Sequence, residues 1–191
     1  MTNLAIALMM ALQIALPGIS QDRLRVVSND MVSVVEEEFS NSSLKSSITR
    51  DEALPMLAAV AVGESALRAD IENCKTTGDG GKSVGLGQVM RGPNWKGFSR
   101  KEICGSRRLQ LKLSLHVIDM CWLRTPTPDA AFRCYTAGDH TKHSYAARKE
   151  YKEYTSVKKS INASMVNQGI RACCATSTAS LYIREQLSCE M

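Results

Sequence analysis

One acidic residue lies on the apolar face of a segment with helical periodicity. Leu57, Val60 and Leu67 recur at three- and seven-residue spacing, which is typical of one helix face. Glu64 lies four residues after Val60 and three before Leu67, so it shares that face. A carboxylate there is costly unless it is paired, and burial raises its pKa. Two interpretations stay open: a general acid that stays protonated near neutral pH, or a structural glutamate paired with Arg68 or an arginine of a later helix.

Three short motifs follow one another along the chain. A Glu64-Ser65 pair ends the periodic segment, residues 83–90 read SVGLGQVM, and residues 133–139 read RCYTAGD. Glycines let a backbone approach a ligand closely, and a glutamine amide offers both donors and an acceptor. In this order the motifs resemble those of the lytic transglycosylase and goose-type lysozyme superfamily, over roughly residues 54–154.

The resemblance implies an all-helical, lysozyme-like domain that cuts the β-1,4 bond between N-acetylmuramic acid and N-acetylglucosamine in peptidoglycan. It implies Glu64 as the catalytic residue, with no metal and no organic cofactor. Leu86 and Met90 would form the floor of the cleft, and Tyr135 would donate its hydroxyl to Glu64. The expected substrate-binding residues are Ser65, Ser83, Gly85, Leu86, Gln88, Met90 and Tyr135.

The sequence is compatible with two reaction types and with one catalytically inactive alternative. In a transglycosylase a single Glu64 suffices, because it protonates the leaving oxygen and then accepts the proton of the muramic acid C6 hydroxyl. In an inverting hydrolase a second carboxylate roughly 6.5–9.5 Å away activates water, and Asp79 in the Gly-rich loop is the candidate. Asp79 could equally serve a tight turn. Thr136 replaces the usual Asn of the family pattern, which leaves room for a structural or assembly protein that keeps the fold without turnover.

The tryptophans and a group of basic residues could either bind substrate or have only a structural role. Sugars stack on aromatic faces, and Trp95, in the loop after the second motif, is the expected sugar-binding tryptophan, whereas Trp122 is expected in the core. Arg107, Arg108 and Lys112 could meet the carboxylates of peptidoglycan peptide stems or simply solvate a helix face.

Cysteine usage argues against a structural metal site. The chain has seven cysteines and no CxxC, and its histidines are not at zinc-finger spacing. Pairs Cys74–Cys104 and Cys121–Cys134 could form disulfides, with free buried thiols as the alternative. No role is assigned to the three histidines, His116, His140 and His143.

Composition predicts one mainly α-helical domain. The chain has 191 residues, with 44% apolar and 5% aromatic residues, enough for one core and poor in the residues that favour β-sandwiches. The net charge of +5 lacks the dense basic stripe of a nucleic-acid binder, so no specific nucleic acid is expected as a partner. Four segments are expected: an apolar segment 1–20, an amphipathic helix and Ser-rich linker 21–50, a lysozyme-like catalytic domain 51–156, and a C-terminal helical extension 157–191.

Local patterns predict where several elements begin and end. Pro55 belongs in a first helical turn, which places a helix start near residue 51, and Asp129 is the expected N-cap of a later helix. No strand is expected. Further helices are expected over 21–39, 107–123 and 177–187, with a solvated helix face over 149–159.

The apolar residues 4–19 have three interpretations. They could be an export signal, a buried N-terminal helix or a membrane-inserting segment, so membrane contact through this segment stays open. An apolar N-terminal segment together with a small cleaving domain fits a protein of a phage virion or of the bacterial cell envelope (periplasm). The expected partners are peptidoglycan glycan strands and virion or envelope proteins.

Overall fold

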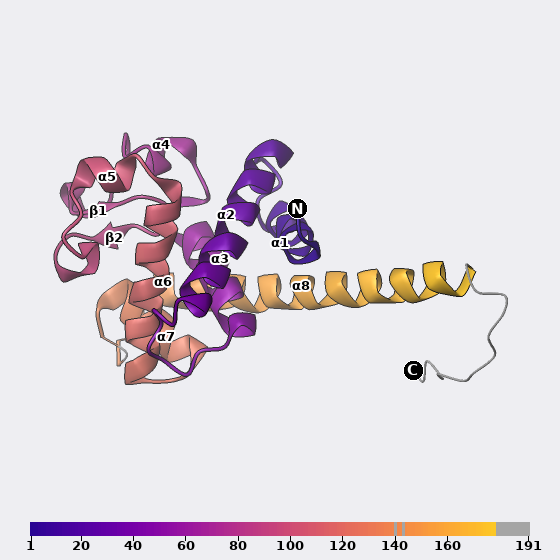
Figure 1. Ribbon diagram of the computed structural model, residues 1–191. Coiled ribbons are helices and arrows are strands. Elements are labelled where there is room, and N and C mark those ends of the chain that lie inside the picture. The colour runs from indigo at the N-terminus through magenta and orange to yellow at the C-terminus, as the bar shows by residue number, and fades with distance from the viewer. Residues whose placement is uncertain (140, 143, 179–191) are drawn as a thin grey trace.

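The chain folds into a mainly α-helical domain, which confirms the predicted fold class. The structure is a computed structural model that describes residues 1–139, 141–142 and 144–178, with side chains described as far as residue 166. Figure 1 shows helices around a central bundle, with a smaller lobe at one end and one long helix projecting from the other. The elements are α1 (Asn3–Ala15), α2 (Gln21–Ser40), α3 (Arg50–Ser65), α4 (Ala69–Glu72), η1 (Asp79–Gly81), β1 (Ser83–Val84), β2 (Val89–Met90), η2 (Pro93–Trp95), α5 (Arg100–Cys104), α6 (Arg107–Arg124), α7 (Pro128–Ala137) and α8 (Tyr145–Thr178).

Helix α3 forms the centre of the core. Every residue from Ala53 to Val62 is buried, and α2, α6 and α8 pack around the helix. A helix that is apolar on all sides is expected in such a position. Pro55 lies in the second turn, because α3 already begins at Arg50. The predicted first-turn position of Pro55 is therefore wrong by one turn. Pro55 is buried in the core, and because proline has no backbone N–H, the helix lacks one hydrogen bond at this residue.

The apolar N-terminal residues form α1. Thr2 caps the helix by accepting a hydrogen bond from the backbone N–H of Ala5. Leu8 and Leu12 are fully buried, and α1 packs against α8 and α2. This packing corresponds to the buried-helix interpretation of residues 4–19. Among the described residues, no helix combines the length and apolar character that a bilayer crossing requires.

A small β-hairpin corrects the expectation that the chain has no strand. Strands β1 and β2 pair antiparallel, with Ser83 opposite Met90 and Val84 opposite Val89. Each strand has only two residues, so no alternating pattern could develop in the sequence. The hairpin, η1, η2 and α5 make up the smaller lobe, which we call the β lobe (residues 73–106).

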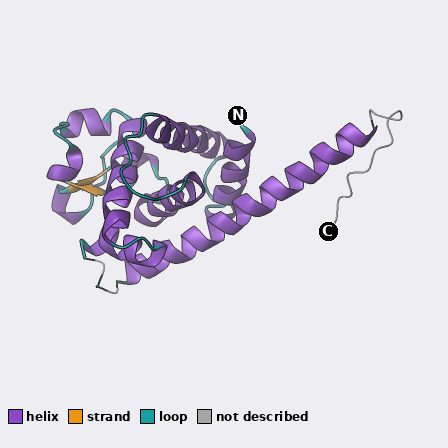
Figure 2. Cartoon of the chain, turned by 60° about the horizontal axis from the view of Figure 1, so that its bottom comes forward, coloured by secondary structure: helices purple, strands orange, loops and turns teal. Residues whose placement is uncertain are grey.

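Helix α8 differs most from expectation. Residues 149–159 are predicted as a solvated helix face, and Lys149, Lys152 and Lys159 are exposed as expected. On the opposite face of the same helix, Glu150, Tyr154 and Val157 are buried, which the sequence analysis does not anticipate. The helix begins against α1, α3 and α7 and then extends away from the body as far as Thr178 (Figures 1 and 2). The helix predicted over 177–187 lies almost entirely outside the described residues.

The sequence also predicts one helix cap and leaves two disulfides possible. Thr127, not Asp129, caps α7, because its hydroxyl accepts the N–H of Ala130 and Pro128 occupies the first turn. Both suggested disulfides are present, Cys74–Cys104 and Cys121–Cys134, with Cα atoms 5.6 Å apart in each.

The basic residues of α6 are engaged within the chain. Arg107 pairs with Asp30 and Glu72, whereas Arg108 and Lys112 both pair with Glu37. These contacts join α6 to α2 and α4. The three basic side chains are therefore neither free for an external carboxylate nor merely solvated.

Candidate active site

A groove of about 370 Å³ lies between the β lobe and the helical core. The C-terminal end of α3 forms one side, η1 and the hairpin form the other, and α6, α7 and the start of α8 close it. Its lining residues are Glu64, Gly78, Asp79, Ser83, Gln88, Val89, Met90, Asn94, Val117, Tyr135, Thr136 and Ala146.

Glu64 occupies the last turn of α3, as its motif predicts. Its side chain is partly exposed toward the groove and partly buried. Ser65, which follows it, is buried and turned away: its hydroxyl donates to the Ala61 carbonyl at 2.7 Å and accepts the Leu67 N–H at 3.2 Å. Ser65 thus ends α3 and does not line the groove, so its expected role in substrate binding is not supported by its position.

A second glutamate meets Glu64 from α8. Glu150 is only 1% exposed and its carboxyl is hydrogen-bonded to that of Glu64. The backbone of Gly63 makes room for it, because a Cβ there would lie 2.7 Å from Glu150 Cγ. The other oxygen of Glu150, Oε2, has no hydrogen-bond partner among the described residues. Within the described part of the chain no basic side chain forms an ion pair with this buried carboxyl, an arrangement that favours its neutral form.

The two carboxyl groups titrate as one unit. Burial, followed by the negative charge of Glu64, raises the pKa of Glu150 to about 10. Burial also raises the pKa of Glu64, and the negative charge of Asp79 adds to that shift, while the hydrogen bond donated by Glu150 opposes it. Two carboxylates this close cannot both ionise readily. The pair therefore retains at least one proton at neutral pH.

The structural alternative for Glu64 in the sequence was an ion pair with an arginine. Arg68 instead forms a bidentate pair with Asp70, at 2.6 and 3.0 Å. Among the described residues, the groups that act on Glu64 are Glu150, Asp79 and Lys149. The alternative in which Glu64 pairs with Arg68 is therefore wrong.

Asp79 lies on the opposite side of the groove. It has a left-handed backbone conformation (φ 49°) in η1, and Ser83 Oγ donates a hydrogen bond to its Oδ2 at 2.7 Å. Its side chain is exposed, in contrast to that of Glu64. The tight-turn interpretation of Asp79 therefore holds, and because the residue also lines the groove, its role as a second carboxylate stays a prediction.

Tyr135 corrects one expected contact. Its hydroxyl donates to the carbonyl of Gly87 at 2.7 Å rather than to Glu64. Burial is the main reason why its pKa lies well above the usual value, and the negative charge of Glu64 adds to this shift. A Cβ on Gly87 would lie 2.7 Å from the tyrosine oxygen and 2.1 Å from Ser114 Oγ. Tyr135 therefore ties the hairpin turn to α7, and only glycine fits at residue 87.

Of the other residues of the second motif, some line the groove and others are buried in the core. Ser83, Gln88 and Met90 line the groove, and Met90 is 52% exposed. The Gln88 amide donates to the Gly85 carbonyl at 2.9 Å, which holds the side chain across its own turn. Leu86 is fully buried in the core and forms no part of the groove floor.

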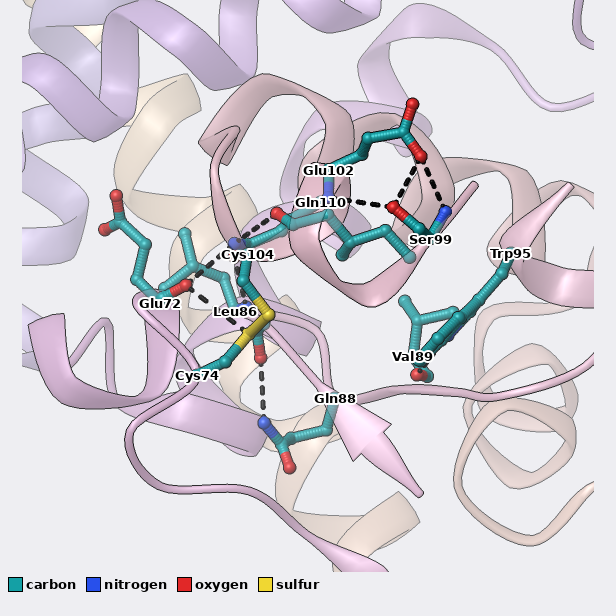
Figure 3. Close-up of a disulfide and its surroundings, with 12 residues drawn as sticks. Glu72, Cys74, Leu86, Gln88, Val89, Trp95, Ser99, Glu102, Cys104 and Gln110 are labelled. Atoms are coloured by element: carbon teal, nitrogen blue, oxygen red, sulfur yellow. Dashed lines mark hydrogen bonds between the residues drawn. A yellow bond between two sulfur atoms is a disulfide. The ribbon is translucent and has the colours of Figure 1, made fainter. Parts of the chain in front are cut away.

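Gln110 holds the hairpin turn from below. Its amide oxygen accepts the Leu86 N–H at 2.9 Å, and its nitrogen donates to the carbonyls of Glu72 and Ile103 (Figure 3). Gly85, with φ +77°, packs directly on this side chain. Gly85 is thus needed for close packing inside the lobe, not for contact with a ligand in the groove.

The two tryptophans and His116 lie outside the groove. Trp122 packs in the main core, as predicted. Trp95 is 7% exposed, and its indole N–H donates to the Val89 carbonyl at 3.0 Å (Figure 3), so it is not among the groove residues. His116 is not among them either, and burial lowers its pKa. His140 and His143 lie outside the described residues.

Glu150 is the site residue that sequence reasoning missed, although a signal was present. Ala147, Glu150, Tyr154, Val157 and Ile161 follow one another at alternating three- and four-residue spacing and all are buried. This is the same pattern, an acid on an apolar helix face, that singled out Glu64. The many charged residues between Arg148 and Lys159 made this segment look solvent-exposed on all sides.

Comparison with family models, with curated proteins and with solved structures found no match to this chain.

Proposed function

We propose that this protein is a peptidoglycan-cleaving lytic transglycosylase of the lysozyme-like type, with Glu64 as its catalytic acid and base. The observation that carries the proposal is the carboxyl of Glu64, which is partly buried, faces a groove and is bonded to a second buried carboxyl. Burial raises its pKa toward the range in which a general acid works. The order of the three sequence motifs supports the saccharide as substrate.

The reaction needs one group that first gives and then takes a proton. Glu64 donates its proton to the glycosidic oxygen as the bond from that oxygen to C1 of N-acetylmuramic acid breaks. The resulting carboxylate then accepts the proton of the C6 hydroxyl, whose oxygen bonds to C1 and forms a 1,6-anhydro ring. The hydrogen bond from Glu150 stabilises the carboxylate between these two steps.

The Glu64→Gln variant tests this proposal. The amide preserves the size of the side chain but cannot donate an acidic proton, so we expect clearing of purified peptidoglycan in a zymogram to fall by about 10²–10⁴-fold. A matched Glu153→Gln variant, which changes a glutamate on α8 outside the groove, should clear like the wild type. Absence of clearing by the folded wild-type protein would instead favour a structural or assembly role.

A second candidate, hydrolysis with inversion, is favoured by the position of Asp79. Its carboxylate lines the same groove and is close enough to raise the pKa of Glu64. A buried acid facing a solvated carboxylate is the arrangement in which the second group activates water.

Mass spectrometry of the muropeptide products distinguishes the two reactions. A transglycosylase yields anhydro ends, and an Asp79→Asn variant should still yield them at a rate within about tenfold of the wild type. Reducing ends that disappear in Asp79→Asn would identify the hydrolase. Local wall opening by a phage virion, or remodelling of the bacterial envelope, is the setting we propose for either activity.

A further inference from the structure

A second hollow lies next to the groove, on the outer side of the β lobe. Its volume is about 410 Å³. The groove and the second hollow are bordered by the same two chain segments. In the first segment Asp79 lines the groove and Gly81 lines the hollow; in the second, Met90 lines the groove and Arg91 lines the hollow. We call it the cationic hollow; its residues are Gly81, Arg91, Gly92, Trp95, Gly97, Phe98, Ser99 and Arg100.

The chain segments that border the cationic hollow are rich in basic residues that form no ion pair among the described residues. Residues 80–101 contain no Asp or Glu but five basic residues, Lys82, Arg91, Lys96, Arg100 and Lys101. None of these five takes part in an ion pair within the described part of the chain, in contrast to the basic residues of α6. The next acid, Glu102, accepts both the N–H and the hydroxyl of Ser99 in a capping box. Unpaired arginines around a hollow favour an anionic ligand.

The two arginines are held by ordered elements. The Arg91 guanidinium lies 6.0 Å above the ring centroid of Trp95, which is itself fixed by burial and by its bond to Val89 (Figure 3). Arg100 begins α5, and its Nη1 is 3.9 Å from where a Cβ of Gly81 would lie. The Cys74–Cys104 disulfide anchors the other end of α5.

We propose that the cationic hollow binds a carboxylate of the peptide stem of peptidoglycan while the glycan strand occupies the groove. This inference rests on the proposed function. Peptide stems branch from the glycan at the muramic acid, so a carboxylate is carried beside the strand that reacts. Arginine binds carboxylates through two parallel hydrogen bonds. Phe98, 40% exposed at the rim, offers an apolar contact to the aliphatic part of the stem.

The enzyme should therefore prefer glycan strands that carry peptides. We expect initial cleavage rates about 10-fold higher on soluble peptide-bearing strands than on strands from which an amidase has removed the peptides, because charge-assisted hydrogen bonds add to binding. Strands whose stem carboxylates have been amidated should react like the peptide-free strands. In the Arg91→Gln/Arg100→Gln variant the rates on peptide-bearing and peptide-free strands should become equal within about twofold. The Lys152→Gln/Lys159→Gln variant removes the same charge from exposed positions on α8 and should keep the full preference.

Each outcome of this experiment has one meaning. Equal cleavage of both strands by the wild type, or a preference that survives in the arginine variant, overturns the carboxylate site and leaves the proposed function intact. A preference that persists on amidated strands also overturns it, because the peptide rather than its charge would then be recognised. Failure of the wild type to cleave either strand overturns the proposed function and this inference with it.

Discussion

Glu64 and Glu150 approach each other from different helices and share a proton, and neither forms an ion pair with a basic side chain of the described residues. Among the described residues, Lys149 is the positive charge that acts on both carboxyls, and its effect is smaller than that of burial. Such a pair keeps one carboxyl neutral when isolated glutamates are ionised. At the scale of single residues, this pair is what sets Glu64 apart from the other acids of the chain.

The pair also makes folding stability depend on pH. The pKa of Glu150 is raised from 4.5 to about 10, so between these values the folded chain holds a proton that the unfolded chain has lost. A folded state that binds more protons is destabilised as pH rises. We expect the wild type to lose stability from this group as pH rises, by on the order of 1 kcal/mol per pH unit within that window, and Glu150→Gln to lose that slope.

Urea denaturation of both proteins at pH 5 and pH 8 checks this expectation. Glu150→Gln should gain stability over the wild type at pH 8 and gain little or none at pH 5. Parallel pH dependences in the two proteins would show that Glu150 is ionised when folded. Glu153→Gln, also on α8, serves as the matched control and should follow the wild type.

At the scale of elements, the site depends on how closely α3 and α8 approach. Gly63 is the point of contact, with the side chain of Glu150 lying against its backbone. Glycine inside a helix normally costs about 0.5–1 kcal/mol relative to alanine, so its presence in α3 has a packing reason.

We expect Gly63→Ala to destabilise the protein by about 1–3 kcal/mol. The new Cβ would lie 2.7 Å from Glu150 Cγ, and relieving this overlap in a packed core outweighs the gain in helix propensity. Gly18→Ala is the control, because nothing lies within 4 Å of its added Cβ. Chemical denaturation measures both changes, and a Gly63→Ala protein more stable than the wild type would contradict the packing described.

At the scale of the whole molecule, two disulfides secure the two parts that enclose the groove. Cys74–Cys104 spans 30 residues within the β lobe, and Cys121–Cys134 spans 13 residues between α6 and α7. The lobe has only a small core of its own, built on Val84, Val89 and Trp95 among others. A small core gains most from a covalent link.

Replacing both cysteines of either pair by serine should lower the free energy of unfolding by about 3 kcal/mol, the loop-closure contribution for links of these lengths. The Cys74→Ser/Cys104→Ser variant should also lower the proposed activity more than the other variant does, because its disulfide lies in the β lobe, which forms one side of the groove. Thermal unfolding with and without reductant measures the effect. A wild-type melting curve that reductant does not change would contradict it.

The sequence by itself determined the features that depend on residues near each other in the chain. Helical periodicity identified α2, α3 and α6, and it placed Glu64 on the buried face of its helix. The cysteine content left both disulfides as possibilities beside free thiols, and the structure forms both. Local hydrogen-bonding patterns and apolar spacing are properties of short segments, so they can be recognised before any packing is known.

Only the tertiary structure decided which distant groups meet. Glu150 lies 86 positions after Glu64, and nothing local links them; their pairing follows from the packing of α3 against α8. In the same way, the hydroxyl of Tyr135 donates a hydrogen bond to the Gly87 carbonyl. The backbone N–H of Leu86 donates to the Gln110 amide oxygen, and the Leu86 side chain lies in the core. Proton affinity at the site depends on burial and on neighbouring charge, and both are fixed by contacts between segments that are distant along the chain.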